Sequence, residues 1–394
     1  MREKGGCGVR YTNSDYIIAI RRELHRVPEI GYDLPKTVAI VKRELDRIGI
    51  EYTEEYGDSS IVCVINPEKE FTIALRADMD ALPIEEKTGL EFSSVHPGIM
   101  HACGHDAHTA CLLGAAEVLY GMRDRLDCRV KLIFQPNEEG VDSAADLLVG
   151  KGVLDGVDVI LGLHVDNTVK SGYIGICPGA SMASCRNLEI EFFGKTAHAA
   201  FSHTGADALC AAVSAYNGIQ LMLARQIDPK KPRVCSIGAL HSGEAQNVVA
   251  DYAVMRGTVR TYESELDGQI YTNICSIVEK SAEETGCTCR ITSSAFLPPV
   301  YNDPKITELL KRSASLVVGE ERVITIDPKM SSEDFADYLV KVPGVFFRIG
   351  TADPDSEVQT SAHNNDFVID ESALSYGADT FVQFVIDNVG GITK

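Results

Sequence analysis

The sequence predicts an α/β protein with a mixed, mainly parallel sheet and a smaller α+β domain inserted into it. Three observations lead to this fold class. The first 181 residues alternate amphipathic helices with apolar runs of strand length. Residues 182–293 follow the order strand-helix-strand-strand-helix-strand, which is the ferredoxin-like split pattern. The α/β alternation then returns and continues through the rest of the chain.

Two predicted helices open the first part, at 15–27 and 34–48. Apolar residues recur in them at helical spacing, and the helices stop at Pro28 and Gly49. A third helix, rich in small residues, is expected at 109–120. Short apolar runs followed by polar or glycine-rich residues predict four strands, at 61–65, 71–75, 130–134 and 157–163.

The inserted part contains two expected helices, at 206–225 and 264–284. Its strands are expected at 188–193, 234–240, 252–259 and 288–292. After it, helices at 303–317 and 372–388 flank a strand at 345–349. The sequence therefore divides into a discontinuous main domain, 1–181 and 294–394, and an inserted domain, 182–293.

Composition excludes several classes of partner. The chain has 37 basic and 57 acidic residues, a formal net charge of −20. Nucleic acid and anionic membrane surfaces are disfavoured, because both require a basic footprint. No window reaches the roughly 18 uninterrupted apolar residues of a membrane span. Twelve scattered cysteines without a secretory signal favour reduced thiols and a cytoplasmic location.

Residue types that bind metals follow the predicted strands. Asp78 and Asp80 come after the strand at 71–75, Glu138 and Glu139 come after 130–134, and His164 ends 157–163. Three histidines, one cysteine and one aspartate crowd into residues 101–108. In open α/β sheets, sites lie beyond the carboxyl ends of the strands, and zinc prefers thiolate and imidazole ligands.

Each feature alone has an ordinary explanation: solvated turn acids, polar residues at a helix start, or a core histidine. The combination is more specific, because five side chains can together hold two metal ions: Cys103, His105, Glu139, His164 and His363. A hydroxide held between two cations is nucleophilic near neutral pH. Glu138 is then the candidate general base, which takes a proton from water and returns it to the leaving amine.

These residues, in this order, resemble the amidohydrolase branch of the aminoacylase/carboxypeptidase metallopeptidase family. That branch includes hippurate hydrolases, auxin-conjugate hydrolases and N-acetyl-diaminopimelate deacetylases. The resemblance runs from the segment at 24–29, through RADMDALP, MHACGHDAH, NEEG and GLHV, to MSSEDF and His363. It implies a zinc-peptidase-like catalytic domain with a ferredoxin-like lid that forms a homodimer.

The resemblance also implies residue roles. The five residues above are expected to be metal ligands for two zinc or manganese ions, with Glu138 as base and Asp80 orienting a ligand. His198 is similar to a lid histidine that reaches the partner subunit's site and stabilises the oxyanion. Asn247 and Arg260 are similar to residues that hold the substrate carboxylate. The implied reaction is hydrolysis of an N-acyl amino acid or related conjugate.

The chain departs from the family pattern at Asn137 and Asp142, on either side of the glutamates, and at Phe201 and Ala250, near the substrate side of the lid. The resemblance therefore does not fix the acyl group or the amino acid. Three alternatives stay open. One is a dipeptidase or carboxypeptidase with the same metal chemistry. Another is a cysteine amidase with Cys103 as nucleophile and His105 or His108 as base. The last is a metal-binding dimer that has lost catalysis.

Overall fold

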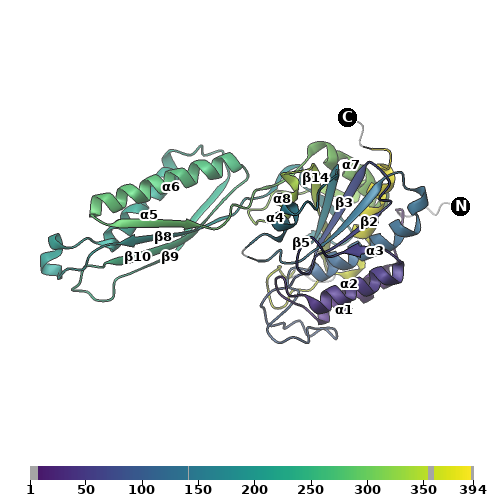
Figure 1. Cartoon of the computed structure of the whole chain (residues 1–394), viewed down its shortest axis with the longest axis horizontal. Helices are drawn as coiled ribbons and strands as arrows, with labels where there is room; N and C mark the ends of the chain where they lie inside the picture. Colours follow the sequence, from purple (N-terminus) through teal and green to yellow (C-terminus); the bar gives the residue numbers. More distant parts are fainter. Residues whose placement is uncertain (1–7, 141, 354–358, 392–394) are drawn as a thin grey trace. The chain divides into compact units, whose positions relative to one another are not determined.

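The computed structural model describes residues 8–140, 142–353 and 359–391, and these form two compact units (Figure 1). Unit 1 takes in the chain up to Gly179 together with Tyr301–Asp327 and the segment from Asp334 onward. Unit 2 comprises Ala180–Val300 and Pro328–Glu333. The division expected from the sequence placed 180–181, 294–300 and 328–333 in the main domain.

Unit 1 is built on an eight-stranded sheet with the order β1-β2-β4-β3-β5-β14-β6-β13. The parallel pairs are β3 with β4, β3 with β5, β5 with β14, and β6 with β13. The pairs β1–β2, β2–β4 and β6–β14 are antiparallel. This confirms the mixed, mainly parallel sheet. Its strands are β1 (Tyr52–Thr53), β2 (Ile61–Ile65), β3 (Thr72–Asp78), β4 (Arg129–Gln135), β5 (Val159–Lys170), β6 (Ile174–Ile176), β13 (Val323–Thr325) and β14 (Gly344–Ala352).

Helices pack on both faces of this sheet. On one face α3 contacts β3, β4 and β5, and Leu161 and Leu163 of β5 are buried in the same apolar core as the α3 residues. On the other face α8 contacts β5 and β14, where Phe335 stacks on Phe346. The helices are α1 (Ser14–Arg26), α2 (Pro35–Ile48), α3 (His105–Gly121), α4 (Ala144–Gly150), α7 (Pro304–Val318), α8 (Phe335–Leu339) and α9 (Leu374–Asp387).

Local sequence explains where several of these helices begin and end. The side chain of Asn13 accepts hydrogen bonds from the first backbone N–H groups of α1, and Asp303 does the same for α7. α2 has proline at its first position and ends at Gly49, whose φ of 89° lies in the left-handed region.

Unit 2 has a four-stranded antiparallel sheet with the order β11-β8-β10-β9, and the chain follows the order β8, α5, β9, β10, α6, β11. This is the ferredoxin-like arrangement that the sequence predicted. Both helices pack on the sheet, with Ile219 of α5 and Ile274 of α6 fully buried. The elements are β8 (Arg186–Phe193), α5 (Ala208–Arg225), β9 (Arg233–Ser242), β10 (Tyr252–Thr261), α6 (Ser264–Thr285) and β11 (Thr288–Ser293).

The sequence does not predict the short strands and helices of the structure. Their hydrogen bonds go to distant parts of the chain, and three-residue strands carry little periodicity. They include a separate two-stranded sheet formed by β7 (Gly179–Met182) and β12 (Val300–Asn302). The others are β1, β6, β13, α4, α8, η1 (Arg123–Arg125), η2 (Ala199–Thr204), η3 (Glu320–Arg322) and η4 (Glu371–Ala373).

Two boundaries near the candidate site also differ from expectation. α3 begins at His105 rather than at 109, so His105 and His108 both lie in its first turn. β5 runs on to Lys170, so His164 lies within the strand rather than at its end. The eleven cysteines in the described ranges are free thiols. Among the described helices, none combines the length and apolar character needed to cross a bilayer.

Candidate metal centre

The candidate site lies beside three parallel strands. β3 is the middle strand, with β4 on one side and β5 on the other. Since the chain moves from β3 to β4 in one direction and then to β5 in the other, the crevice beyond β3 is a switch point of the topology, where open α/β sheets bind ligands. Asp80 follows β3, Glu138 and Glu139 follow β4, and His164 comes from β5.

Gly104 shapes the loop that carries Cys103 and His105. It stands directly before α3 with φ of 90°, a conformation that residues with a side chain rarely adopt. A Cβ atom at this position would lie 2.4 Å from Cγ2 of Val165. The glycine therefore lets the loop approach β5 closely, so that Cys103 reaches His164.

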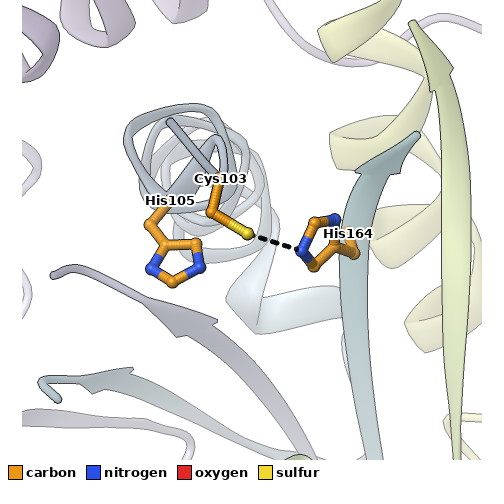
Figure 2. Close-up of side chains that lie close together, drawn as sticks. All are labelled: Cys103, His105 and His164. Carbon is orange, nitrogen blue, oxygen red and sulfur yellow. Dashed lines mark hydrogen bonds between the residues drawn. The ribbon is translucent and has the colours of Figure 1, made fainter. Parts of the chain in front are cut away.

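The five predicted ligands fall into two groups that share Cys103. In the first group, donor atoms of Cys103, His105 and His164 lie within 4.8 Å of one another, and in the second group those of Cys103, Glu139 and His363 do. Figure 2 shows the first group, in which Cys103 Sγ lies 3.3 Å from His164 Nε2. The structure thus brings together all five side chains, and a shared thiolate can bridge two cations.

Hydrogen bonds at Nδ1 leave the Nε2 atoms of His105 and His164 as the ring nitrogens available to the site. Nδ1 of His164 lies 2.6 Å from the carbonyl oxygen of Val165, so Nδ1–H donates to it and Nε2 keeps its lone pair. Nδ1 of His105 lies 3.3 Å from Asp80 Oδ1, so Nε2 is the ring nitrogen that remains for a metal ion. Although burial lowers it, the neighbouring Asp78 carboxylate raises the pKa of His105 well above the usual value, so a metal ion would displace the proton on Nε2. That Nε2 is buried and has no hydrogen-bond partner. In both rings Nδ1 is held by an acceptor, which leaves Nε2 as the nitrogen that would bind a metal ion.

The second group joins strand β4 to the chain's last segment. His363 Nε2 lies 3.1 Å from Glu139 Oε1, and the backbone N–H of His363 donates to the carbonyl oxygen of Ala102 over 2.8 Å. This backbone bond fixes the His363 loop beside Cys103. His363 has φ of 65° and a half-exposed side chain, so it is the most open member of the group.

Asp80 contacts both groups of donor residues, through His105 of the first and Glu139 of the second. Its Oδ1 accepts the backbone N–H of Glu138 and its Oδ2 accepts that of Glu139, both over 3.0 Å, and Oδ1 also faces His105 Nδ1. The carboxylate is 1% exposed, so these bonds are made in a medium of low dielectric constant. One buried anion therefore orients both an imidazole and the loop that carries the two glutamates.

Asp78 and His108, neither of them a predicted ligand, form a second buried pair beside the site. Nδ1 of His108 lies 2.6 Å from Asp78 Oδ1, and its Nε2 accepts the backbone N–H of Val165 over 2.9 Å. With both nitrogens engaged, His108 supports the strand rather than facing the thiol. Although burial alone raises the pKa of Asp78, the surrounding His105, His108 and Arg76 charges hold it well below the usual value.

The surroundings of Cys103 and His164 suit metal ligands better than a catalytic nucleophile and its base. Burial, with Glu139 adding to it, raises the pKa of Cys103 to about 12, whereas nucleophilic cysteines have lowered pKa values. Burial, with help from the His108 and Arg348 charges, holds the pKa of His164 well below the usual value and keeps it neutral. A divalent cation deprotonates a coordinating thiol outright, and thiolate with imidazole and carboxylate suits zinc or manganese.

The other three predicted site residues belong to unit 2. His198 is exposed, and its Nδ1 accepts the backbone N–H of Ala200 over 3.1 Å, which leaves Nε2–H as a donor. The carbonyl oxygen of Asn247 accepts the N–H of Ala199, so Asn247 lies next to the His198 loop. Arg260 donates to Ser332 Oγ over 3.1 Å. Their roles toward a substrate stay predictions.

The chain has a cluster of thiol, imidazole and carboxylate groups at a switch point of an α/β sheet. This site and the similarities to known proteins identify its class, a metal-dependent hydrolase of amide bonds. Residues 74–387 match the peptidase family M20/M25/M40, and the chain belongs to this family. The resemblance to its amidohydrolase branch is thereby confirmed.

Similar proteins match almost the whole length of the chain. N-acetyl-L-cysteine deacetylase of Bacillus subtilis (strain 168) is 38% identical over 91% of this chain and 84% of its own. Thermostable carboxypeptidase 1 of Saccharolobus solfataricus is 36% identical over 92% and 93%. IAA-amino acid hydrolase ILR1-like 4 of Arabidopsis thaliana is 33% identical over 92% and 83%. The crystal structure of the Bacillus subtilis YXEP protein, described as a dinuclear metal binding peptidase, is 32% identical with a TM-score of 0.81, over 96% and 99%.

Proposed function

We propose that this chain hydrolyses the amide bond of N-acyl amino acids or related amino-acid conjugates, releasing a carboxylic acid and a free amino acid. We further propose that it does so with two divalent ions, zinc or manganese, as a homodimer. The observation that carries the proposal is the pair of three-residue donor groups that share Cys103, beside Glu138, which belongs to neither of these two groups. Two relatives, named as a deacetylase and a conjugate hydrolase, support the substrate class.

The donor set determines which residues would hold the ions. Cys103, His105 and His164 would bind one ion, and Cys103, Glu139 and His363 the other. When bound, such a pair polarises a carbonyl oxygen and lowers the pKa of water toward neutrality. Asp80 fixes the ring of His105 and the Glu138–Glu139 backbone before substrate arrives, which is the preorganisation that catalysis requires.

Glu138 is the proposed proton carrier. Its Oε2 lies 3.9 Å from His105 Nε2, so the carboxylate points toward the donor cluster. In the proposed reaction it accepts a proton from the attacking water and delivers it to the leaving nitrogen. His198 would donate from Nε2 to the substrate oxyanion in the partner subunit's site, and Asn247 with Arg260 would hold the substrate carboxylate.

A carboxypeptidase is the second candidate, because one of the relatives is a thermostable carboxypeptidase at 36% identity. The cysteine amidase is disfavoured by the raised pKa of Cys103 and by the hydrogen bonds that occupy both nitrogens of His108. The cytoplasmic location inferred from composition stays a prediction.

The test is a panel of N-acyl amino acids and dipeptides with matched side chains, assayed after loading with zinc or manganese. We expect turnover of the acyl series, its loss on chelation, and recovery when either ion is returned. Glu138→Gln should lose turnover while binding the same amount of metal. Dipeptides cleaved faster than every acyl substrate would replace the proposal with the second candidate, and no turnover of either series would refute both.

A further inference from the structure

Asn137 stands directly before the proposed base, and its backbone lies in the left-handed region with φ of 53°. Left-handed conformations are uncommon outside glycine, and asparagine adopts them more readily than most residues. The next two N–H groups, of Glu138 and Glu139, both point at the carboxylate of Asp80. Successive amides next to such a turn form concavities that bind anions. The turn at Asn137 therefore aims both amides at one carboxylate.

The side chain of Asn137 fixes this turn from inside. It is 7% exposed, and its Nδ2 donates to the carbonyl oxygen of Asp142 over 2.9 Å. Its amide lies over Gly140 so closely that a Cβ there would be 2.3 Å from Oδ1. The side chain of Asn137 is thus packed tightly against the backbone of Gly140, which restricts the conformation of the turn.

We propose that Asn137 is a positioning residue for the reaction: its left-handed backbone and its tethered amide hold Glu138 at the angle needed for proton transfer. The inference rests on the proposed function, in which Glu138 is the base. Asn137 acts through Glu138 and does not itself touch substrate. Proton transfer requires hydrogen-bond reach, and a misplacement of about 1 Å can cost about a hundredfold in rate.

The two contributions of Asn137 can be separated by substitution. Asn137→Gly keeps the left-handed backbone and removes the tether. Asn137→Ala removes the tether and disfavours the backbone conformation as well. At metal concentrations that fill both sites in every variant, we expect kcat to fall about tenfold in the alanine variant and less in the glycine variant, with KM unchanged.

Asn66 offers a matched control far from the strand ends of the site. It also has left-handed φ, 55°, and its Nδ2 also donates to backbone carbonyls, those of Arg123 and Leu126. Asn66→Ala should lower the free energy of unfolding, as Asn137→Ala does, but should leave kcat at the wild-type value. An equal loss of kcat in both alanine variants would show a general effect of the substitution and overturn the inference.

The decisive experiment combines Asn137→Ala with Glu138→Asp. If Asn137 acts through Glu138, its tenfold factor should shrink to less than about twofold once Glu138 is shortened, because coupled residues are not additive. A factor that stays tenfold, or a kcat loss that follows loss of metal, would overturn the inference and leave the proposed base intact. Wild-type turnover in Glu138→Asp and Glu138→Gln would instead refute the base, and with it the inference.

Discussion

Replacing Asp80 by asparagine tests the hydrogen-bonded core of the site with almost no change in volume. The carboxylate oxygens accept the N–H groups of Glu138 and Glu139, each over 3.0 Å. An asparagine must turn its NH2 toward one of these donors, so one hydrogen bond to a charged group is lost, at about 1.5–3 kcal/mol. At 1.36 kcal/mol per factor of ten, that corresponds to about tenfold to a hundredfold weaker metal binding. Residues that orient metal ligands typically have effects of this size.

The assay is titration of the metal-free protein with zinc or manganese against a competing chelator. Asp379→Asn is the matched control. Asp379 is fully buried, and its Oδ1 also accepts two backbone N–H groups, those of Tyr11 and Thr12. We expect both variants to lose stability and only Asp80→Asn to lose metal affinity. Asp80→Asn binding metal within twofold of wild type, or Asp379→Asn losing as much affinity, would refute the reasoning.

Three further predictions concern Gly104, the reactivity of Cys103 and the titration of Asp337. Gly104→Ala should destabilise the fold by about 2–5 kcal/mol, the sum of left-handed strain and the contact with Val165, and urea unfolding measures it; a loss below 0.5 kcal/mol would contradict this. In metal-free protein at neutral pH, iodoacetamide should alkylate exposed Cys210 well before Cys103, as peptide mass spectrometry reports, because burial raises the pKa of Cys103 to about 12. Burial also raises the pKa of Asp337 to about 6 from its usual 3.8, so its stabilising contribution is complete below pH 3.8 and is lost as pH rises through 6. Asp337→Asn should therefore unfold at a higher temperature than wild type at pH 7.5 and at the same temperature near pH 4; an equal difference at both pH values would contradict the assignment.

Much of the fold could be predicted because its longer elements have clear local patterns. The strand predicted at 61–65 is β2, with the same bounds, and the helix predicted at 264–284 is α6 to within one residue. The start of α3 was missed by four residues. Its first turn carries His105 and His108, buried polar residues that break the apolar pattern by which a helix is recognised.

The candidate site could be predicted as a set of residues but not as a set of hydrogen bonds. Residue types at the ends of three strands, together with the cluster of histidines and cysteine at 101–108, were enough to group Cys103, His105 and His164. The bond from the backbone N–H of Val165 that holds His108 away from the ligands depends on backbone angles with no sequence pattern of their own. The left-handed φ of Asn137 is the exception, since asparagine is a recognised signal for it.

The most direct test is anomalous diffraction from crystals of the protein loaded with zinc or manganese. We expect two peaks per chain, both within bonding distance of Cys103 Sγ, one next to His105 and His164 and the other next to Glu139 and His363. A single peak, or a peak held by Asp78 and His108 in place of the Cys103 groups, would contradict the two-ion centre.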